Sequence, residues 1–328
     1  MSVQSSQALA VPVERPRPIL PSLGIADQLY RRIVTGAGFL TLVILVLIGL
    51  FLVLKALPTF RLMGLSFFTT SVWKPALHQF GILAVLYWTV VIAVSALVIA
   101  LPVSVAGALF INEYAPRQFR RALTALVDLL AAIPSVIYGI WGLAFLQPRL
   151  VGLSRWLTDD LGFIPLFKTH GTNFAGSAFM AGVVVSLMVM PICTSVIREV
   201  FSQTPPGEKE AALALGASRW GMIGMVVLPF GRGGIVGASM LGLGRALGET
   251  IAVALIISPT NLISVHILQS GANSAAALIA LQFGEASQSY GIPALMAAGL
   301  SLFVLTLVVN FIASLIVARS RSGKGVEI

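Results

Sequence analysis

Long apolar runs separated by short polar segments dominate the chain. A helix that crosses the roughly 30 Å hydrocarbon core of a bilayer needs about 20 mainly apolar residues. Six stretches meet this requirement, at residues 34–54, 81–111, 122–146, 176–197, 233–257 and 291–318. A seventh apolar stretch, 275–283, is too short to cross and is expected to lie on the surface or re-enter. The pattern therefore predicts an all-α polytopic membrane protein with six transmembrane helices.

The segments outside the spans have separate predicted roles. Residues 1–33 contain four prolines and several serines and glutamines, which favours a disordered tail before the first span. Residues 198–232 form the longest polar loop on the side that we assign to the cytoplasm, and residues 319–328 form a short C-terminal tail. The predicted transmembrane domain thus covers residues 34–318.

Composition supports the membrane class and excludes several others. Hydrophobic residues make up 57% of the chain and charged residues 10%, against about 45–50% and about 25% in soluble domains. The net charge of +9 does not indicate nucleic-acid binding, because the basic residues lie between apolar runs instead of forming one face. Three histidines, His78, His170 and His266, fall in separate loops, so no metal site is expected.

The distribution of basic residues predicts the orientation. Fourteen of the 21 lysines and arginines lie in the N-terminal tail, in the loops after the second and fourth spans and in the C-terminal tail. Six lie in the alternate loops, and Arg245 lies within a span. Because cytoplasmic loops of membrane proteins are enriched in lysine and arginine, both termini are predicted to be cytoplasmic.

The polar loop 198–232 has the pattern of two short helices joined at a glycine. Pro205 and Pro206 end the preceding helix, and the alanine- and leucine-rich run that follows favours a helix that stops at Gly216. Ser218 can cap a second helix, which is expected to run until Pro229. These residues alone leave open a simpler interpretation, in which an amphipathic hairpin rests on the membrane surface.

The fifth span carries two charges, Arg245 and Glu249, four residues apart and therefore expected on one helical face. A charge at the bilayer centre costs about 2.5–3.5 kcal/mol on insertion scales, so the pair should face a partner helix or a wet cavity. Arg245 offers a planar, permanently charged fork to an oxyanion, and Glu249 would hold it when the path is empty. The alternative is a buried ion pair that only fixes packing. Small-xxx-small spacings, which let helices approach closely, surround the pair at Gly233 with Gly237 and Gly244 with Gly248.

Two groups of residues carry a resemblance to known families. Glu210-Ala211-Ala212, Gly216 and Leu228-Pro229 match the spacing of the EAA signature of ABC importer permeases, with Val226 where that signature has isoleucine. Residues 241–253 resemble the matching span of the C-type permease family of bacterial phosphate importers (PstC). Residues 101–116, 129–145 and 273–285 are also similar to that family, and the resemblance covers roughly residues 80–317.

The resemblance implies the fold of an ABC type I importer permease (MetI-like) and a place in a bacterial plasma-membrane importer. In that family the chain pairs with a second, A-type permease, two ATPase subunits bind ATP and Mg, and a phosphate-binding protein delivers inorganic phosphate. Arg245 and Glu249 match its translocation residues, and the EAA residues match the segment that couples to the ATPase. This chain has no P-loop of its own, so it is expected to bind no cofactor.

Three other functions compete with phosphate import. Strings related to Arg245–Glu249 occur in sulfate and molybdate permeases, so another oxyanion is the main alternative. A passive anion channel would not need the EAA spacing. An intramembrane enzyme would need a nucleophile and a base, or paired acids, and no predicted span contains histidine.

Overall fold

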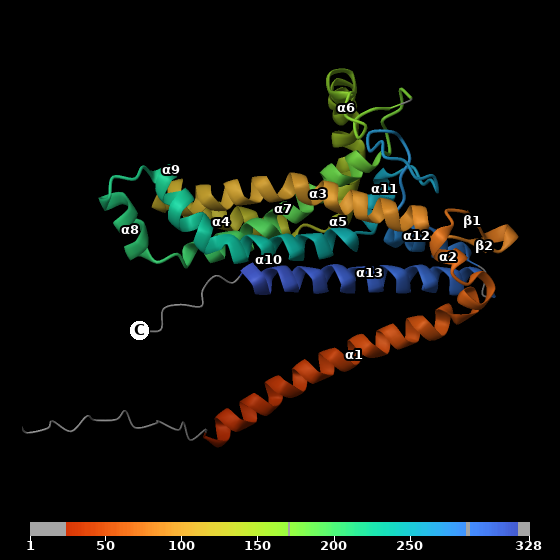
Figure 1. The fold of residues 1–328 in the computed structure, drawn as a ribbon, viewed down its shortest axis with the longest axis horizontal. Coiled ribbons are helices and arrows are strands. Elements are labelled where there is room, and N and C mark those ends of the chain that lie inside the picture. Colours follow the sequence, from red (N-terminus) through yellow and green to blue (C-terminus); the bar gives the residue numbers. More distant parts are fainter. Residues whose placement is uncertain (1–23, 170, 287–288, 321–328) are drawn as a thin grey trace, which may run out of the picture. The chain divides into compact units, whose positions relative to one another are not determined.

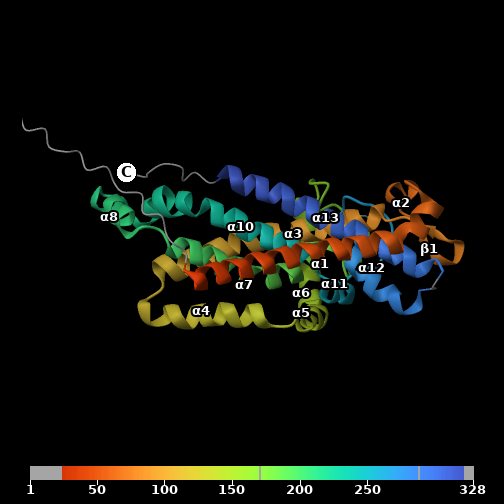
Figure 2. The ribbon, with the colours of Figure 1, turned by 90° about the horizontal axis from the view of Figure 1, so that it is seen from below.

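The computed structural model describes residues 24–169, 171–286 and 289–320. The chain divides into two units, Met1–Ile48 and Gly49–Ile328, and each is described by itself. Helices dominate the described residues (Figures 1 and 2), and six of those helices are long and apolar enough to cross a membrane. The predicted all-α class with six spans is confirmed.

The first unit contributes the start of α1, which runs from Ile25 to Met63. Asp27 stands in its first turn, where an acid suits the positive end of the helix dipole. The tail that we predicted to be disordered up to residue 33 is therefore helical from Ile25, and residues 1–23 lie outside the described part. The remainder of α1 belongs to the second unit, where Ala56 and Thr59 are buried.

Four long helices form the main core of the second unit. They are α3 (Leu83–Leu109), α7 (Ala178–Ser202), α10 (Leu228–Leu247) and α13 (Gly291–Ser320). α3 packs along α7, and α10 packs against α7, α3 and α13. Small residues allow this close packing: a Cβ on Gly182 of α7 would lie 2.9 Å from the Cβ of Ser95 on α3. The predicted second, fourth and sixth spans coincide with α3, α7 and α13.

The third predicted span, 122–146, is not one helix. α4 (Arg117–Ala132) ends before Ile133 and Pro134, both of which are extended, and α5 (Ser135–Trp141) starts after them. Pro134 cannot donate a backbone hydrogen bond and disfavours helical geometry at the residue before it. The apolar helical stretch instead continues from α5 through a wide π turn, Gly142–Leu146, into α6 (Gln147–Leu161). Pro134 therefore separates two helices within the stretch that was predicted as one span.

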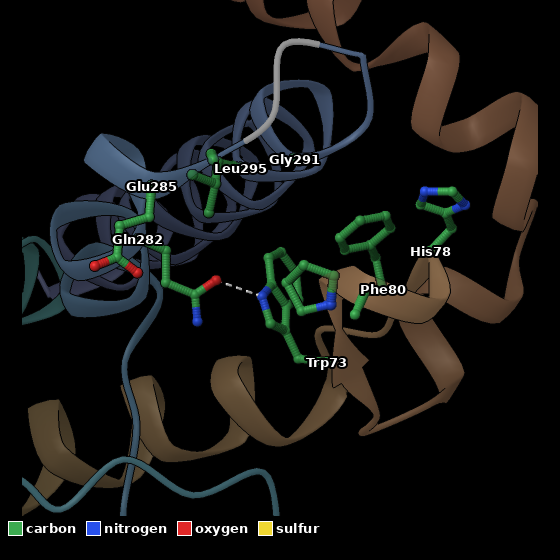
Figure 3. Close-up of a pocket in the computed structure, with 10 residues that line it drawn as sticks. Trp73, His78, Phe80, Gln282, Glu285, Gly291 and Leu295 are labelled. Atoms are coloured by element: carbon green, nitrogen blue, oxygen red, sulfur yellow. Dashed lines mark hydrogen bonds between the residues drawn. The ribbon is translucent and has the colours of Figure 1, made fainter.

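Short elements join the long helices at one end of the second unit. They are α2 (Ser66–Thr69), the antiparallel strands β1 (Trp73–Lys74) and β2 (Gln79–Phe80) around a 3₁₀ turn (Pro75–Leu77), α11 (Ile251–Ile256), α12 (Ala275–Gln282) and a 3₁₀ turn (Phe283–Glu285). In Figure 3 the indole Nε1 of Trp73 donates a 2.6 Å hydrogen bond to Oε1 of Gln282, which ties the strands to α12. α12 is too short to span, as predicted, and of the two predicted alternatives a surface position is wrong for its first turn, where Ala275, Ala276 and Ala277 are buried.

One face of α10 is shaped by glycines that contact α7. A Cβ on Gly234 would lie 2.5 Å from Val200, and one on Gly242 would lie 2.7 Å from Val189 and 2.8 Å from the sulfur of Cys193. Gly237, on the same helix, has nothing within 4 Å of its Cβ position among the described residues. α10 therefore has one glycine face occupied by its own chain and another that stays open.

This packing predicts different effects of one substitution at two sites on α10. Gly242→Leu should overpack the contact with α7 and lower the free energy of unfolding by about 1–3 kcal/mol or more. Gly237→Leu, the matched control, should leave the stability of the isolated chain unchanged. Thermal unfolding of the two variants in detergent measures the difference, and equal midpoints would contradict the packing described for Gly242.

Candidate functional site

The loop between α7 and α10 forms the predicted hairpin. α7 ends at Ser202, α8 (Pro206–Ala214) begins at the second of the two prolines, and Gly216 makes the corner with a positive φ of 88°. α9 (Arg219–Met222) begins at Ser218, whose hydroxyl accepts a 3.1 Å hydrogen bond from the backbone N–H of Gly221. Both views show the hairpin at one end of the second unit, far from α12 (Figures 1 and 2).

The hairpin differs from the prediction at its exit. Pro229 was expected to end the second helix, but α9 continues through a wide π turn, Ile223–Val227, directly into α10. A π turn changes the hydrogen-bonding register of a helix. This one ends two residues before Pro229, which has no N–H to donate. The hairpin is therefore continuous with the helix that carries Arg245.

The hairpin exposes large apolar side chains that nothing in the described chain covers. Leu215 is 90% exposed and Trp220 is 68% exposed, and Glu210 and Ala211 of the EAA residues are exposed as well. Exposed apolar groups of this size gathered on one element mark protein interaction surfaces. Of the other residues predicted for coupling, Gly216 and Pro229 are exposed, whereas Ala212 and Leu228 are partly buried and pack against the core of the chain.

An ion pair that sequence reasoning missed fixes α8 to the end of α3. The Nζ of Lys209 lies 2.6 Å from Oε1 of Glu113, and the two side chains are only 21% and 10% exposed. Glu113 belongs to a π turn, Phe110–Tyr114, that extends α3. In the same turn, the amide of Asn112 donates a 2.7 Å hydrogen bond to the carbonyl of Arg198. No sequence signal links Lys209 to Glu113, because they lie 96 residues apart.

The two charges of the fifth span are placed differently from the prediction. α10 ends at Leu247, so Arg245 lies in its last turn and Glu249 lies beyond it. Glu249 is 8% exposed, and its Oε1 accepts a 3.3 Å hydrogen bond from the N–H of Ala252 at the start of α11. Within the described residues, no ion pair joins Arg245 to Glu249. The expected shared helical face and ion pair are therefore wrong for this structure.

Arg245 is exposed on the surface of the described chain, away from its apolar core. A guanidinium in a membrane span needs a polar environment, so this exposure fits a position against a cavity or another subunit. Asn310 of α13 lies nearby: its amide oxygen is 3.5 Å from the Cβ position of Gly244. Sequence reasoning missed Asn310, although a lone amide in an apolar span was a usable signal.

The histidines do not come together in the structure. The ring of His78 contacts that of Tyr290 in a tilted arrangement with centroids 4.2 Å apart, and Nδ1 of His266 lies 2.8 Å from the carbonyl of Pro165. His170 lies outside the described residues. Among the residues that the structure describes, no group of three metal-ligating side chains is present.

The sequence of this chain is similar to those of membrane components of transport systems. The model of the family described as "Binding-protein-dependent transport system inner membrane component" matches residues 100–322. The phosphate transport system permease protein PstC 2 of Mycobacterium tuberculosis is 41% identical over 302 residues, which cover 90% of this chain and 93% of the relative. The phosphate transport system permease protein PstC of Xylella fastidiosa is 40% identical over 303 residues, covering 92% and 93%.

A solved structure with a similar fold belongs to a bacterial ABC transporter involved in the import of the acidic polysaccharide alginate. The TM-score is 0.53 with 21% sequence identity, and the match covers 90% of this chain and 98% of that chain. At this identity the likeness concerns the fold alone, and it confirms the predicted importer-permease fold.

The Lys209–Glu113 pair predicts how α8 is held. Because the pair is largely buried, Lys209→Gln or Glu113→Gln leaves one charge without its partner and should remove about 1–3 kcal/mol of local stability, which corresponds to amide exchange faster by at least roughly fivefold. The double variant Glu113→Lys with Lys209→Glu should restore slow exchange by reversing the pair. Hydrogen–deuterium exchange over Pro206–Ala214 measures this, and unchanged exchange in both single variants would show that the pair does not hold α8.

Proposed function

Because the chain belongs to the family of binding-protein-dependent transport system inner membrane components, we propose that it is a permease subunit of a bacterial phosphate importer. The observation that carries the proposal is identity of 40–41% to named phosphate permeases across about nine-tenths of the chain. The family match itself spans residues 100–322, which include both the hairpin and Arg245. The chain is a multi-pass membrane protein.

The proposed assembly pairs this chain with a second, A-type permease. Two ATPase subunits supply the energy and bind ATP and Mg, and a phosphate-binding protein delivers substrate on the outer side. The excess of basic residues in alternate segments supports cytoplasmic termini and a cytoplasmic hairpin in a bacterial plasma membrane. The open glycines of α10, Gly233 and Gly237, support close approach of another helical subunit at that face.

Coupling to the ATPase is assigned to the hairpin. Its exposed Leu215 and Trp220 offer the apolar contact for docking, and Gly216 supplies the tight corner. The Lys209–Glu113 pair connects α8 to the end of α3, so a displacement of the hairpin pulls on the core of the chain. Closure of the ATPase subunits would then rock the spans of the two permeases and open the cavity outward.

Translocation is assigned to Arg245, with Glu249 as its neighbour at the helix break. The guanidinium can hold a phosphate oxyanion through two parallel hydrogen bonds. Substrate sites of several transporters lie where membrane helices are discontinuous, and the break between α10 and α11 supplies such a place. Reversal of the cavity would release phosphate inward. The same chemistry suits sulfate or molybdate, so transport measurements decide between these anions.

Replacing Arg245 tests the translocation role. Arg245→Gln removes the charge-assisted hydrogen bonds, each of about 1.5–3 kcal/mol, and should reduce phosphate uptake by at least about tenfold. Arg232→Gln, which removes an exposed arginine from the other end of α10, should keep most of the uptake. Uptake of labelled phosphate by the reconstituted complex measures both, with sulfate and molybdate as competing substrates.

Three results of that experiment would contradict the proposal. Normal uptake by Arg245→Gln in an assembled complex would reduce Arg245 to a packing role. Uptake of sulfate or molybdate in place of phosphate would transfer the function to another oxyanion. Downhill phosphate flux through the chain without any ATPase subunit would indicate a passive channel.

Replacing Gly216 tests the coupling role. Valine at a φ of 88° costs about 1–2 kcal/mol, so Gly216→Val should distort the corner and weaken ATPase docking without blocking membrane insertion. Gly207→Ala, in a helical position with nothing within 4 Å of the new Cβ among the described residues, is the matched control. Co-purification of the ATPase with each variant gives the readout, and full recovery with Gly216→Val would rule out this role for the corner.

A further inference from the structure

Four arginines converge on a hollow at the end of the second unit that carries the hairpin. Arg117, Arg120 and Arg121 come from the first two turns of α4, and Arg198 comes from the last turns of α7. The hollow has a volume of about 470 Å³, and none of its lining residues belongs to α10. It is therefore built from different elements than the place assigned to Arg245.

The positive charge in this hollow is not balanced by the chain. The described residues contain one ion pair, Lys209–Glu113, and it involves none of the four arginines. Asp128 is the only acid that lines the hollow, and its Oδ1 accepts a 3.3 Å hydrogen bond from the hydroxyl of Ser195. Three of the four arginines also lie at the positive end of the α4 dipole, with no acid in its first turn.

The guanidinium groups make few hydrogen bonds within the described residues. Nε of Arg198 is buried and has no partner in the described structure. Arg120 donates one long hydrogen bond, 3.4 Å, to the carbonyl of Ala115. The general excess of arginine on the cytoplasmic side of membrane proteins accounts for basic residues at this end, but it does not require two helices to gather them around one hollow.

The rest of α4 places these arginines near a membrane surface. α4 has no buried residue, and it exposes Phe119, Leu126 and Leu129 while its start is basic. α4 packs along α7, one of the candidate spans, and both views show the two helices running side by side (Figures 1 and 2), so the basic start of α4 lies at the end of the helix bundle, where lipid headgroups would be. Basic hollows between helices on the cytoplasmic side bind phosphate-bearing headgroups.

We propose that this hollow, lined by Arg117, Arg120, Arg121 and Arg198, binds a phosphate-group anion, presented by an anionic phospholipid headgroup or by free inorganic phosphate. Guanidinium forks bind phosphate oxygens in pairs, and the anion neutralises the end of α4. This site is separate from the translocation role of Arg245 and does not depend on it.

Two pairs of substitutions with equal charge loss test the proposal. Arg120→Gln with Arg121→Gln removes two cations from the hollow. Arg219→Gln with Arg232→Gln removes two exposed cations from α9 and α10, outside the hollow. All four side chains are exposed, so both variants should fold. Arg117→Gln alone serves as a second variant of the hollow.

Two measurements on the full-length protein, purified with the subunits that accompany it, distinguish the sources of the anion. Native mass spectrometry after reconstitution with phosphatidylglycerol and phosphatidylcholine counts bound anionic lipid. Binding of labelled inorganic phosphate in phosphatidylcholine nanodiscs, in an Arg245→Gln background, reports free phosphate at this site. The Arg120/Arg121 variant should weaken binding of either phosphatidylglycerol or inorganic phosphate by about tenfold or more, because it loses charge-assisted contacts to the anion. The Arg219/Arg232 variant should bind both as the unaltered protein does.

Each outcome decides the matter. Selective loss of phosphatidylglycerol identifies a lipid headgroup as the occupant, and selective loss of phosphate identifies the free anion. Equal losses in the two paired variants would show diffuse surface attraction and overturn the proposal. The proposal would also be overturned if the protein retained neither anion above the phosphatidylcholine background. If the Arg120/Arg121 variant fails to fold, an Arg117→Gln variant that binds the anion as tightly as the unaltered protein would overturn it instead.

Discussion

Every polar backbone group in a membrane span needs an internal partner, because the hydrocarbon supplies none. The break after α10 shows how this chain meets that requirement. The carboxylate of Glu249 accepts the N–H of Ala252, and the hydroxyl of Thr250 donates to the carbonyl of Gly248 at 3.1 Å. These side chains allow the helix to stop inside the fifth span. The break therefore determines where Arg245 lies, in the last turn of α10 and beside an interrupted backbone.

Close packing of small residues is the second constraint, and it gives α10 two different faces. Gly234 and Gly242 are occupied by α7 of the same chain, whereas Gly233 and Gly237 stay open in the described structure. Apolar side chains gain little from contact with each other instead of lipid, so helix association in a membrane depends on such close approach. The small-xxx-small spacing is visible in the sequence. Which of these glycines contact a helix of the same chain depends on where the neighbouring helix lies.

Local signals in the sequence were sufficient for most elements and insufficient for contacts between them. Apolar length located α3, α7 and α13, and helix formers with Gly216 and Ser218 located the hairpin. Apolar length predicted one span across Pro134, because a proline within a membrane helix is often tolerated, and it could not show that the helix ends there. Arg245 and Glu249 do not pair because the helix ends between them, and Lys209 pairs with Glu113 because α8 meets the end of α3. Hydropathy and residue spacing carry no information on either.

The observation that most changes the expected mechanism is the continuity of the helix across Pro229. From Arg219 to Leu247 the chain is one helical path of 29 residues, so Arg219 and Arg245 lie about 40 Å apart along one rod at 1.5 Å per residue. If the helix had ended at Pro229, a movement of the hairpin could have been absorbed at a joint. With a continuous rod, a tilt of the hairpin displaces the end that carries Arg245. The π turn Ile223–Val227, followed closely by Pro229, is where the hydrogen bonding of that rod changes, and π turns often occur at functional sites. Flexing in this rod is therefore expected there, between the hairpin and the membrane core.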